Sequence, residues 1–224
     1  IFKSMWDGLV KKAQLQGISI LKGPINGSIW HQYRCVKETD GSEFFKSELF
    51  CERYYYDFLK TNQPISEISY YSGYRTRFAA ILQAGQPAYD KLAETGFSIR
   101  EMASGSSETL QAIAFISRIV FENSWGFTDL APEEFLKLYS PEKIDVNIAK
   151  VYLLYKDNQI IGFCGTLREN DSMLICKTMA LLPECQGRGL GSALAYKVHF
   201  DAREQGIKKI IYASTGGAVY GEPN

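Results

Sequence analysis

The stretch PECQGRGLGSALA, residues 183–195, places three glycines between an apolar run and a pattern typical of an amphipathic helix. A strand that ends in such a turn and opens a helix directs unpaired backbone N–H groups and the positive helix end at one point. Gly187, Gly189 and Gly191 lack a Cβ, so an anion can approach the main chain and φ can be positive. The stretch therefore predicts a phosphate-binding loop, with a tight strand-to-helix turn as the alternative.

The residues around this loop predict a sheet built mostly from consecutive strands. Apolar runs at 151–155 and 160–167 flank a polar turn, and a third run at 173–182 follows another, which indicates an antiparallel meander. Helical spacing continues after the loop until Gly206, and the run 207–214 predicts a strand parallel to the one before the loop. Upstream we expect a strand at 97–102 and helices within 106–125 and 129–139. The expected class is α/β, an α+β mixed sheet.

The first part of the chain is less regular. It predicts a helix, a strand, a second helix and a second strand, in the stretches 4–17, 18–25, 52–62 and 65–74. The segment between Tyr74 and Gly96 is mostly helix-forming and broken near Gly85 and Pro87, so we place a boundary there. The expected domains are residues 1–95 and 96–224.

Composition narrows the classes of protein. The 224 residues are 46% hydrophobic and 22% charged, and 25 basic and 25 acidic side chains give a net charge of +0. Bulk charge therefore offers no attraction for nucleic acid or an anionic membrane, and no apolar run is long enough to span one. Five cysteines without CxxC pairs indicate reduced thiols in the cytoplasm, and two histidines predict no metal site. Because the chain begins at Ile1 and stops soon after a strand, we expect one or both natural ends, including part of the C-terminal domain, to be missing.

Two other phosphate loops fit the stretch less well. The nucleoside triphosphate loop ends in Gly-Lys-Ser/Thr, whereas Leu190, Gly191 and Ser192 follow Gly189 here. A dinucleotide-binding fingerprint needs an acidic residue about 20 residues on, and the next strand ends in Ala-Ser-Thr instead. A nucleotide-dependent oxidoreductase is therefore disfavoured.

The sequence QGRGLG, with the meander before it and the helix and strand after it, resembles the GNAT acyltransferase superfamily over residues 96–214. The resemblance implies N-acyl transfer, and most simply N-acetyl transfer, from acetyl-CoA or another acyl-CoA to a primary amine of a small molecule or peptide. By position, the family's donor contacts fall on the backbone of Met179, Ala180 and Leu181 and on the loop residues Gln186, Gly187, Arg188, Gly189, Leu190, Gly191 and Ser192.

The resemblance also implies a catalytic acid and an acceptor site. Tyr220 is the candidate acid that would protonate the leaving thiolate. Asn123, Trp125 and Phe127 fall in the loop between the first two helices, where family members contact substrate, although an aromatic pair there is as often core. No general base is identified, which keeps a non-catalytic CoA-binding or regulatory module as the alternative function.

The N-terminal part carries a weaker resemblance. The stretch GPINGSIWHQYR, residues 23–34, is similar to the degenerate half of tandem GNAT proteins. This resemblance implies that residues 1–95 form a degenerate GNAT-like or accessory domain that completes a wall of the substrate cleft. The acceptor amine and the oligomeric state are not predicted.

Overall fold

The computed structural model describes residues 2–26, 28–31, 33–45, 48, 50–62, 66–102, 106–138 and 149–216. It divides into two compact units: the smaller holds Ile1–Glu67 and Trp125–Thr128, and the larger holds Ile68–Ser124 and Asp129–Asn224. This division does not coincide with the boundary expected after residue 95, because residues 68–95 supply a strand and a helix to the larger unit.

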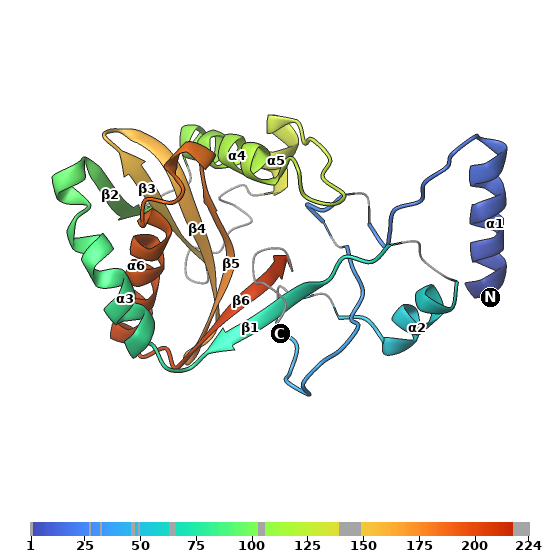
Figure 1. Cartoon of the computed structure of the whole chain (residues 1–224), viewed down its shortest axis with the longest axis horizontal. Coiled ribbons are helices and arrows are strands. Elements are labelled where there is room, and N and C mark those ends of the chain that lie inside the picture. Colours follow the sequence, from blue (N-terminus) through green and yellow to red (C-terminus); the bar gives the residue numbers. More distant parts are fainter. Residues whose placement is uncertain are drawn as a thin grey trace. The chain divides into compact units, whose positions relative to one another are not determined.

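The larger unit is built on a six-stranded mixed sheet (Figure 1). The strand order is β1-β6-β5-β4-β3-β2, and only the β5–β6 pair is parallel among the described strands. The bounds are β1 Tyr70–Arg75, β2 Phe97–Glu101, β3 Ala149–Lys156, β4 Gln159–Asn170, β5 Met173–Leu181 and β6 Lys209–Gly216. The predicted meander and the parallel strand after the loop are confirmed.

Helices cover both faces of this sheet. Helices α3 (Ala79–Asp90) and α6 (Leu190–Glu204) pack together on one face, and α4 (Ser107–Phe121) with α5 (Pro132–Leu138) lies on the other (Figure 1). The Ser106 side chain caps α4 by accepting a hydrogen bond from the Thr109 N–H. The two helices predicted between β2 and β3 are thereby confirmed.

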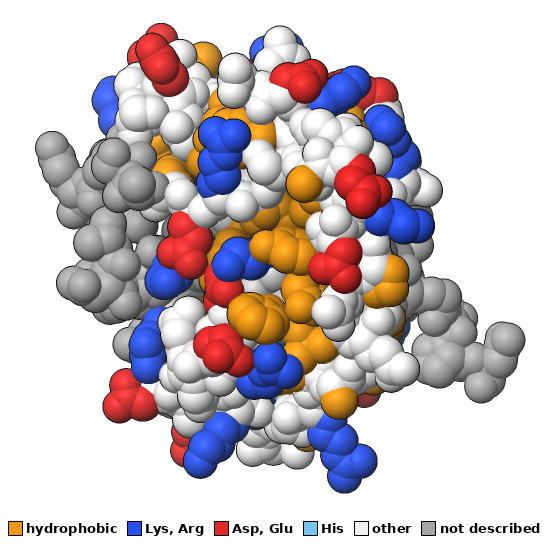
Figure 2. Space-filling view, turned by 90° about the vertical axis from the view of Figure 1, so that its left-hand side faces the viewer, with side chains coloured by type: hydrophobic (Ala, Val, Ile, Leu, Met, Phe, Trp, Pro, Cys, Tyr) orange, Lys and Arg blue, Asp and Glu red, His pale blue; other side chains and the backbone are white. Residues whose placement is uncertain are grey.

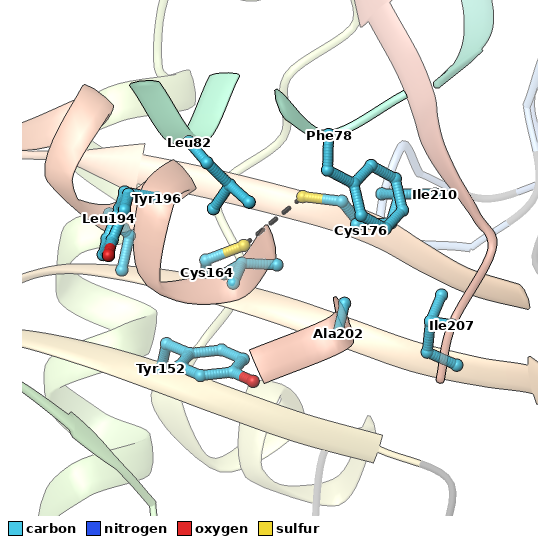
Figure 3. Packing of buried hydrophobic residues seen from close by; sticks show 11 residues of the cluster. Phe78, Leu82, Tyr152, Cys164, Cys176, Leu194, Tyr196, Ala202, Ile207 and Ile210 are labelled. Carbon is cyan, nitrogen blue, oxygen red and sulfur yellow. Dashed lines mark hydrogen bonds between the residues drawn. The ribbon is translucent and has the colours of Figure 1, made fainter. Parts of the chain in front are cut away.

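The main core lies between the sheet and the α3–α6 pair (Figure 3). Phe78 and Leu82 from the start of α3 and Leu194 from α6 cover the neighbouring side chains of Cys164 on β4 and Cys176 on β5. The two thiols lie 3.3 Å apart, and all five cysteines of the chain are free. These buried apolar contacts hold α6, and with it the glycine loop, against the sheet.

Two expectations for the first part of the chain are wrong. The strand expected at 18–25 is reduced to a single bridge between Ile25 and Tyr33, because Pro24 has no N–H to donate and no neighbouring ladder forms. The break expected near Gly85 and Pro87 is absent, since α3 runs through both residues while it packs on α6.

The smaller unit contains two helices, α1 (Phe2–Leu15) and α2 (Arg53–Thr61), as predicted. Aromatic rings join them, with Phe2 and Trp6 each facing Phe58 at 5.7 and 6.2 Å between ring centroids. Among the residues that the structure describes, no helix is both long enough and apolar enough to cross a membrane.

Figure 2 shows the side of the larger unit that carries α3 and β2. Hydrophobic side chains form a band down its middle, and basic and acidic side chains are interspersed on both sides of the band. The described residues of this side thus form no large region of a single charge, in keeping with the balanced composition.

Candidate functional site

The two parallel strands of the sheet separate part of the way along their length. Their register runs from Met173–Lys209 to Cys176–Tyr212 and ends there. Beyond this point β5 stays paired with β4 as far as Leu181, whereas β6 stays paired with β1 (Figure 1). The strands therefore diverge, and a gap opens between the second half of β5 and the end of β6.

Each strand carries an extra residue just beyond the last shared pair. On β5 the extra residue is Lys177. The adjacent residues Thr166 and Gly165 of β4 pair with Cys176 and Thr178, so Lys177 between them has no partner residue in the β4 register. On β6, the step from Tyr212 to Thr215 spans three residues where β1 spans two. Bulges bend a strand and increase its twist, so two of them at the same level turn the strands apart.

The peptide groups at the end of β5 have a defined direction. The Ala180 carbonyl oxygen faces β4, because it would lie 2.8 Å from a Cβ added at Gly162, and the Leu182 N–H donates to Ile161 O at 3.0 Å. In planar trans peptides the N–H and C=O of Leu181 must then point away from β4. By strand alternation those of Met179 point the same way, into the gap.

The glycine loop follows β5 directly. After the short 3₁₀ turn Pro183–Cys185, Gly187 and Gly189 have φ values of +72° and +79°, which supports the predicted need for glycine at both positions. A Cβ added at Gly187 or Gly191 would meet nothing within 4 Å, so the loop is open on its outer side.

Gly189 is the N-cap of α6 and supplies no capping side chain. The Ala193 N–H donates to Gly189 O at 3.0 Å, so the N–H groups of Leu190, Gly191 and Ser192 precede this intrahelical hydrogen bond. These three N–H groups and the helix dipole are available to a bound anion.

Two side chains connect the loop to the sheet. Gln186 Nε2 donates to Leu181 O at 3.0 Å, which ties the loop to the gap-facing end of β5. The Arg188 guanidinium lies 5.1 Å from the centre of the Phe97 ring on β2. The exposed Arg188 therefore adds a positive charge beside the loop.

Helix α3 supports the loop from the N-terminal part of the chain. A Cβ at Gly85 would lie 2.8 Å from both Ser192 O and Tyr196 Cβ, so the absence of a side chain lets α3 approach the first turns of α6. The Ala88 Cβ lies 3.5 Å from the Cβ position of Gly189. Sequence analysis placed this helix in a separate domain and so missed its contact with the loop.

A hydrogen bond between a buried histidine and a partly buried tyrosine at the gap was also missed. His199 of α6 is 1% exposed, and its Nε2 lies 2.5 Å from the hydroxyl of Tyr212, where β6 leaves β5. Burial lowers the pKa of His199 below its usual 6.5; the hydrogen bond to the Ala195 carbonyl opposes this shift and the charge of Arg75 adds to it, so the imidazole is neutral near pH 7. The signal was a histidine on the apolar stripe of the helix, one residue after Val198.

The residues expected at the acceptor site are divided between the two units. Asn123 is exposed and belongs to the larger unit, whereas Trp125 and Phe127 belong to the smaller one. There the Phe127 ring packs edge-on against Trp30 at 6.0 Å, and the Trp30 Nε1–H donates to Thr128 O at 2.9 Å. Tyr220 lies outside the described residues. Within the described ranges, no three His, Cys, Asp or Glu side chains gather as a metal site would require.

Comparison with known proteins gives one family match. Residues 117–218, from the middle of α4 to just past β6, match the Acetyltransferase (GNAT) family. The match covers the meander, the glycine loop, α6 and both strands of the gap. No curated protein sequence matches the chain significantly.

Solved structures with a similar arrangement are distant in sequence. An aminoglycoside acetyltransferase, meta-AAC0020 from an uncultured soil metagenomic sample, in complex with sisomicin, has a TM-score of 0.44 and 16% identity over 55% of this chain and 80% of its own. The PaiA N-acetyltransferase of Thermoplasma acidophilum in complex with coenzyme A has a TM-score of 0.39 and is 19% identical, over 49% of this chain and 75% of its own. L-PGS of Bacillus licheniformis has a TM-score of 0.46 and is 14% identical, over 76% of this chain and 53% of its own.

Proposed function

Because residues 117–218 match the Acetyltransferase (GNAT) family, we propose that this protein transfers an acyl group, most simply acetyl, from acyl-CoA to a primary amine. The observation that carries the proposal is the position of the open glycine loop next to the gap between β5 and β6. A loop that binds phosphates and a gap that exposes peptide groups together suit a long ligand with a charged end and an extended, amide-containing arm.

The loop would hold the pyrophosphate of the donor. The N–H groups of Leu190, Gly191 and Ser192, with the open backbone at Gly187 and Gly191, supply donors without a Cβ in the way at the glycines. The Arg188 side chain would add charge, and Gln186 would keep the loop in register with β5.

The end of β5 would hold the arm and the thioester. Peptide groups of Met179 and Leu181 that point into the gap would pair with the amides of the arm, as strands pair. The Leu181 N–H is the donor we assign to the thioester carbonyl oxygen, where it would stabilise the negative charge that develops during attack. The predicted contact at Ala180 is correspondingly reassigned, since its carbonyl faces β4.

The chemistry of the transfer is direct. The lone pair of a neutral amine forms a bond to the thioester carbon, the C–S bond breaks, and the amine loses one proton while the thiolate gains one. We propose Tyr220 as the acid for the thiolate and Asn123, Trp125 and Phe127 as acceptor-side residues. We further propose that residues 1–95 act as an accessory half, that the acceptor is a small-molecule or peptide amine, and that the protein is cytoplasmic, as its free cysteines favour.

Calorimetric titration of acetyl-CoA tests the donor site. The wild-type protein should bind at roughly micromolar Kd, and Gly187→Trp should abolish binding, because its side chain would occupy the open side of the loop. Gly206→Trp is the matched control, because Gly206 has a similar φ of +76° in open space beyond the opposite end of α6. Loss of binding in both variants, or in neither, would contradict the assignment of the loop, and NAD binding in place of acetyl-CoA would indicate an oxidoreductase.

Turnover separates an enzyme from a binding module. A panel of primary amines and amine-bearing peptides, incubated with acetyl-CoA and a thiol reagent, should show thiol release that depends on both substrates. Binding of acetyl-CoA without release in any reaction would favour the non-catalytic role.

A further inference from the structure

His199 and Tyr212 form a polar contact beside the apolar side chains of the main core. The centroids of the two rings lie 5.9 Å apart with an interplanar angle of 26°. The Phe78 ring packs edge-on against the imidazole, with 5.4 Å between the ring centroids. Burying the His199 imidazole costs desolvation that an apolar side chain of the same size would avoid, so its presence needs a reason beyond filling space.

The partners of the imidazole fix its protonation. His199 Nδ1 lies 2.7 Å from the carbonyl oxygen of Ala195, which only accepts, so Nδ1 carries the hydrogen. In the neutral ring Nε2 is then an acceptor, and the Tyr212 hydroxyl donates to it. The hydrogen bonds therefore run in one direction, from Tyr212 to His199 and from His199 to the backbone of α6.

This chain of hydrogen bonds joins the two parts of the proposed donor site. Tyr212 is the last residue of β6 that pairs with β5, so its position sets where the gap opens. His199 lies ten residues after Gly189 on the same helix, about 15 Å along a rigid rod from the loop. A fixed Tyr212–His199 contact therefore fixes the separation between the loop and the mouth of the gap.

We propose that His199 and Tyr212 are a positioning pair for the acyl donor: they hold β6 and α6 in the one arrangement in which the loop and the gap can bind the two ends of acyl-CoA together. The inference rests on the proposed function, since it assumes that the ligand spans both places. Neither side chain needs to touch the donor.

The test compares a ligand that spans both places with one that occupies only the loop. Titrations use acetyl-CoA and 3′-phospho-ADP, the nucleotide part of coenzyme A. In Tyr212→Phe the Kd for acetyl-CoA should rise about 3- to 10-fold, as expected for one lost hydrogen bond, while the Kd for 3′-phospho-ADP stays within about 2-fold of wild type. Tyr196→Phe removes a hydroxyl from the same core and should leave both constants unchanged.

A conservative variant and a spectroscopic readout complete the test. His199→Gln keeps an acceptor for Tyr212 and a donor for Ala195, so it should bind acetyl-CoA more tightly than His199→Leu. The ¹⁵N chemical shifts of the wild-type His199 ring should show a protonated Nδ1 and an unprotonated Nε2. The opposite tautomer, equal weakening of both ligands, or an unchanged Kd for acetyl-CoA in Tyr212→Phe would each overturn the proposal.

The same titrations distinguish failure of the proposed function from failure of the positioning role. If the wild-type protein binds neither ligand and Gly187→Trp behaves identically, the assignment of the donor site is wrong, and the proposed role of the His199–Tyr212 pair is wrong as well. If the wild type binds and Gly187→Trp does not, the donor site is supported and the variants of Tyr212 and His199 decide the inference alone.

Discussion

Cys176 and Tyr212 are the last register pair between β5 and β6, and a bulge follows each of them on its own strand. The gap beyond this pair is therefore a product of local strand irregularity, with each strand kept in place by its outer neighbour. The sheet stays continuous through β4 on one side and β1 on the other. The candidate site thus depends on how closely β4 approaches β5.

Gly162 on β4 tests this dependence. In Gly162→Ala the new methyl would lie 2.8 Å from Ala180 O and 3.1 Å from Leu181 Cγ, so β4 or β5 must shift. We expect the free energy of unfolding in urea to fall by about 1–3 kcal/mol and acetyl-CoA binding to weaken. Gly165→Ala on the same strand meets nothing within 4 Å and serves as the control. Equal effects of the two substitutions would contradict the close approach at Gly162.

Gly85 tests the contact between α3 and the start of α6. Alanine usually stabilises a helix relative to glycine by about 1 kcal/mol, but here its methyl would overlap Ser192 O and Tyr196 Cβ. We expect Gly85→Ala to lower the thermal midpoint and Gly8→Ala, which meets nothing in α1, to preserve or raise it. A raised midpoint for Gly85→Ala would show that the two helices do not pack as closely as described.

The local sequence pattern was sufficient to predict the strands and helices of the second half of the chain. The alternating runs around Asp157, whose φ is +55°, predicted the hairpin of β3 and β4, and the glycine spacing predicted the start of α6. These features depend on turn chemistry and periodicity, which neighbouring residues determine.

Long-range contacts explain what the sequence did not predict. The strand β1 pairs with β6, which lies more than a hundred residues later in the sequence. Gly85 is required by its close contact with α6, which is also more than a hundred residues away in the sequence. The periodicity of apolar residues carries no information about contacts between distant segments, so the sequence predicted a domain boundary after α3. The bulges and the His199–Tyr212 pair were missed for the same reason, because they exist only between elements.

Arg188 provides a test of the charge at the loop. Arg188→Ala should raise the Kd for acetyl-CoA about 5- to 30-fold at low salt, and the difference should shrink as sodium chloride rises to 0.5 M. Arg203→Ala is the matched control, because Arg203 lies over the Phe200 ring at the same 5.1 Å but at the other end of α6. A salt-independent loss, or an equal loss in the control, would rule out a direct charge contribution from Arg188.

The buried His199 predicts a dependence of stability on pH. Its pKa in the folded protein lies below the usual 6.5, because burial outweighs the opposing effect of the hydrogen bond to the Ala195 carbonyl and the charge of Arg75 adds to the lowering. Between these two pKa values the unfolded chain binds a proton that the folded chain does not, so the free energy of unfolding falls as pH drops below about 6.5. One proton limits the slope to about 1.4 kcal/mol per pH unit.

Urea unfolding of wild type and His199→Gln between pH 5 and 8 measures this contribution. Carboxylates and other groups titrate alike in both proteins, so the difference between the two curves isolates His199. We expect the advantage of wild type to be constant above about pH 7 and to shrink steadily below 6.5, because only the wild type must bury a neutral imidazole. Parallel curves across the whole range would mean that His199 has the same pKa folded and unfolded, contrary to its burial against Phe78 and Tyr212.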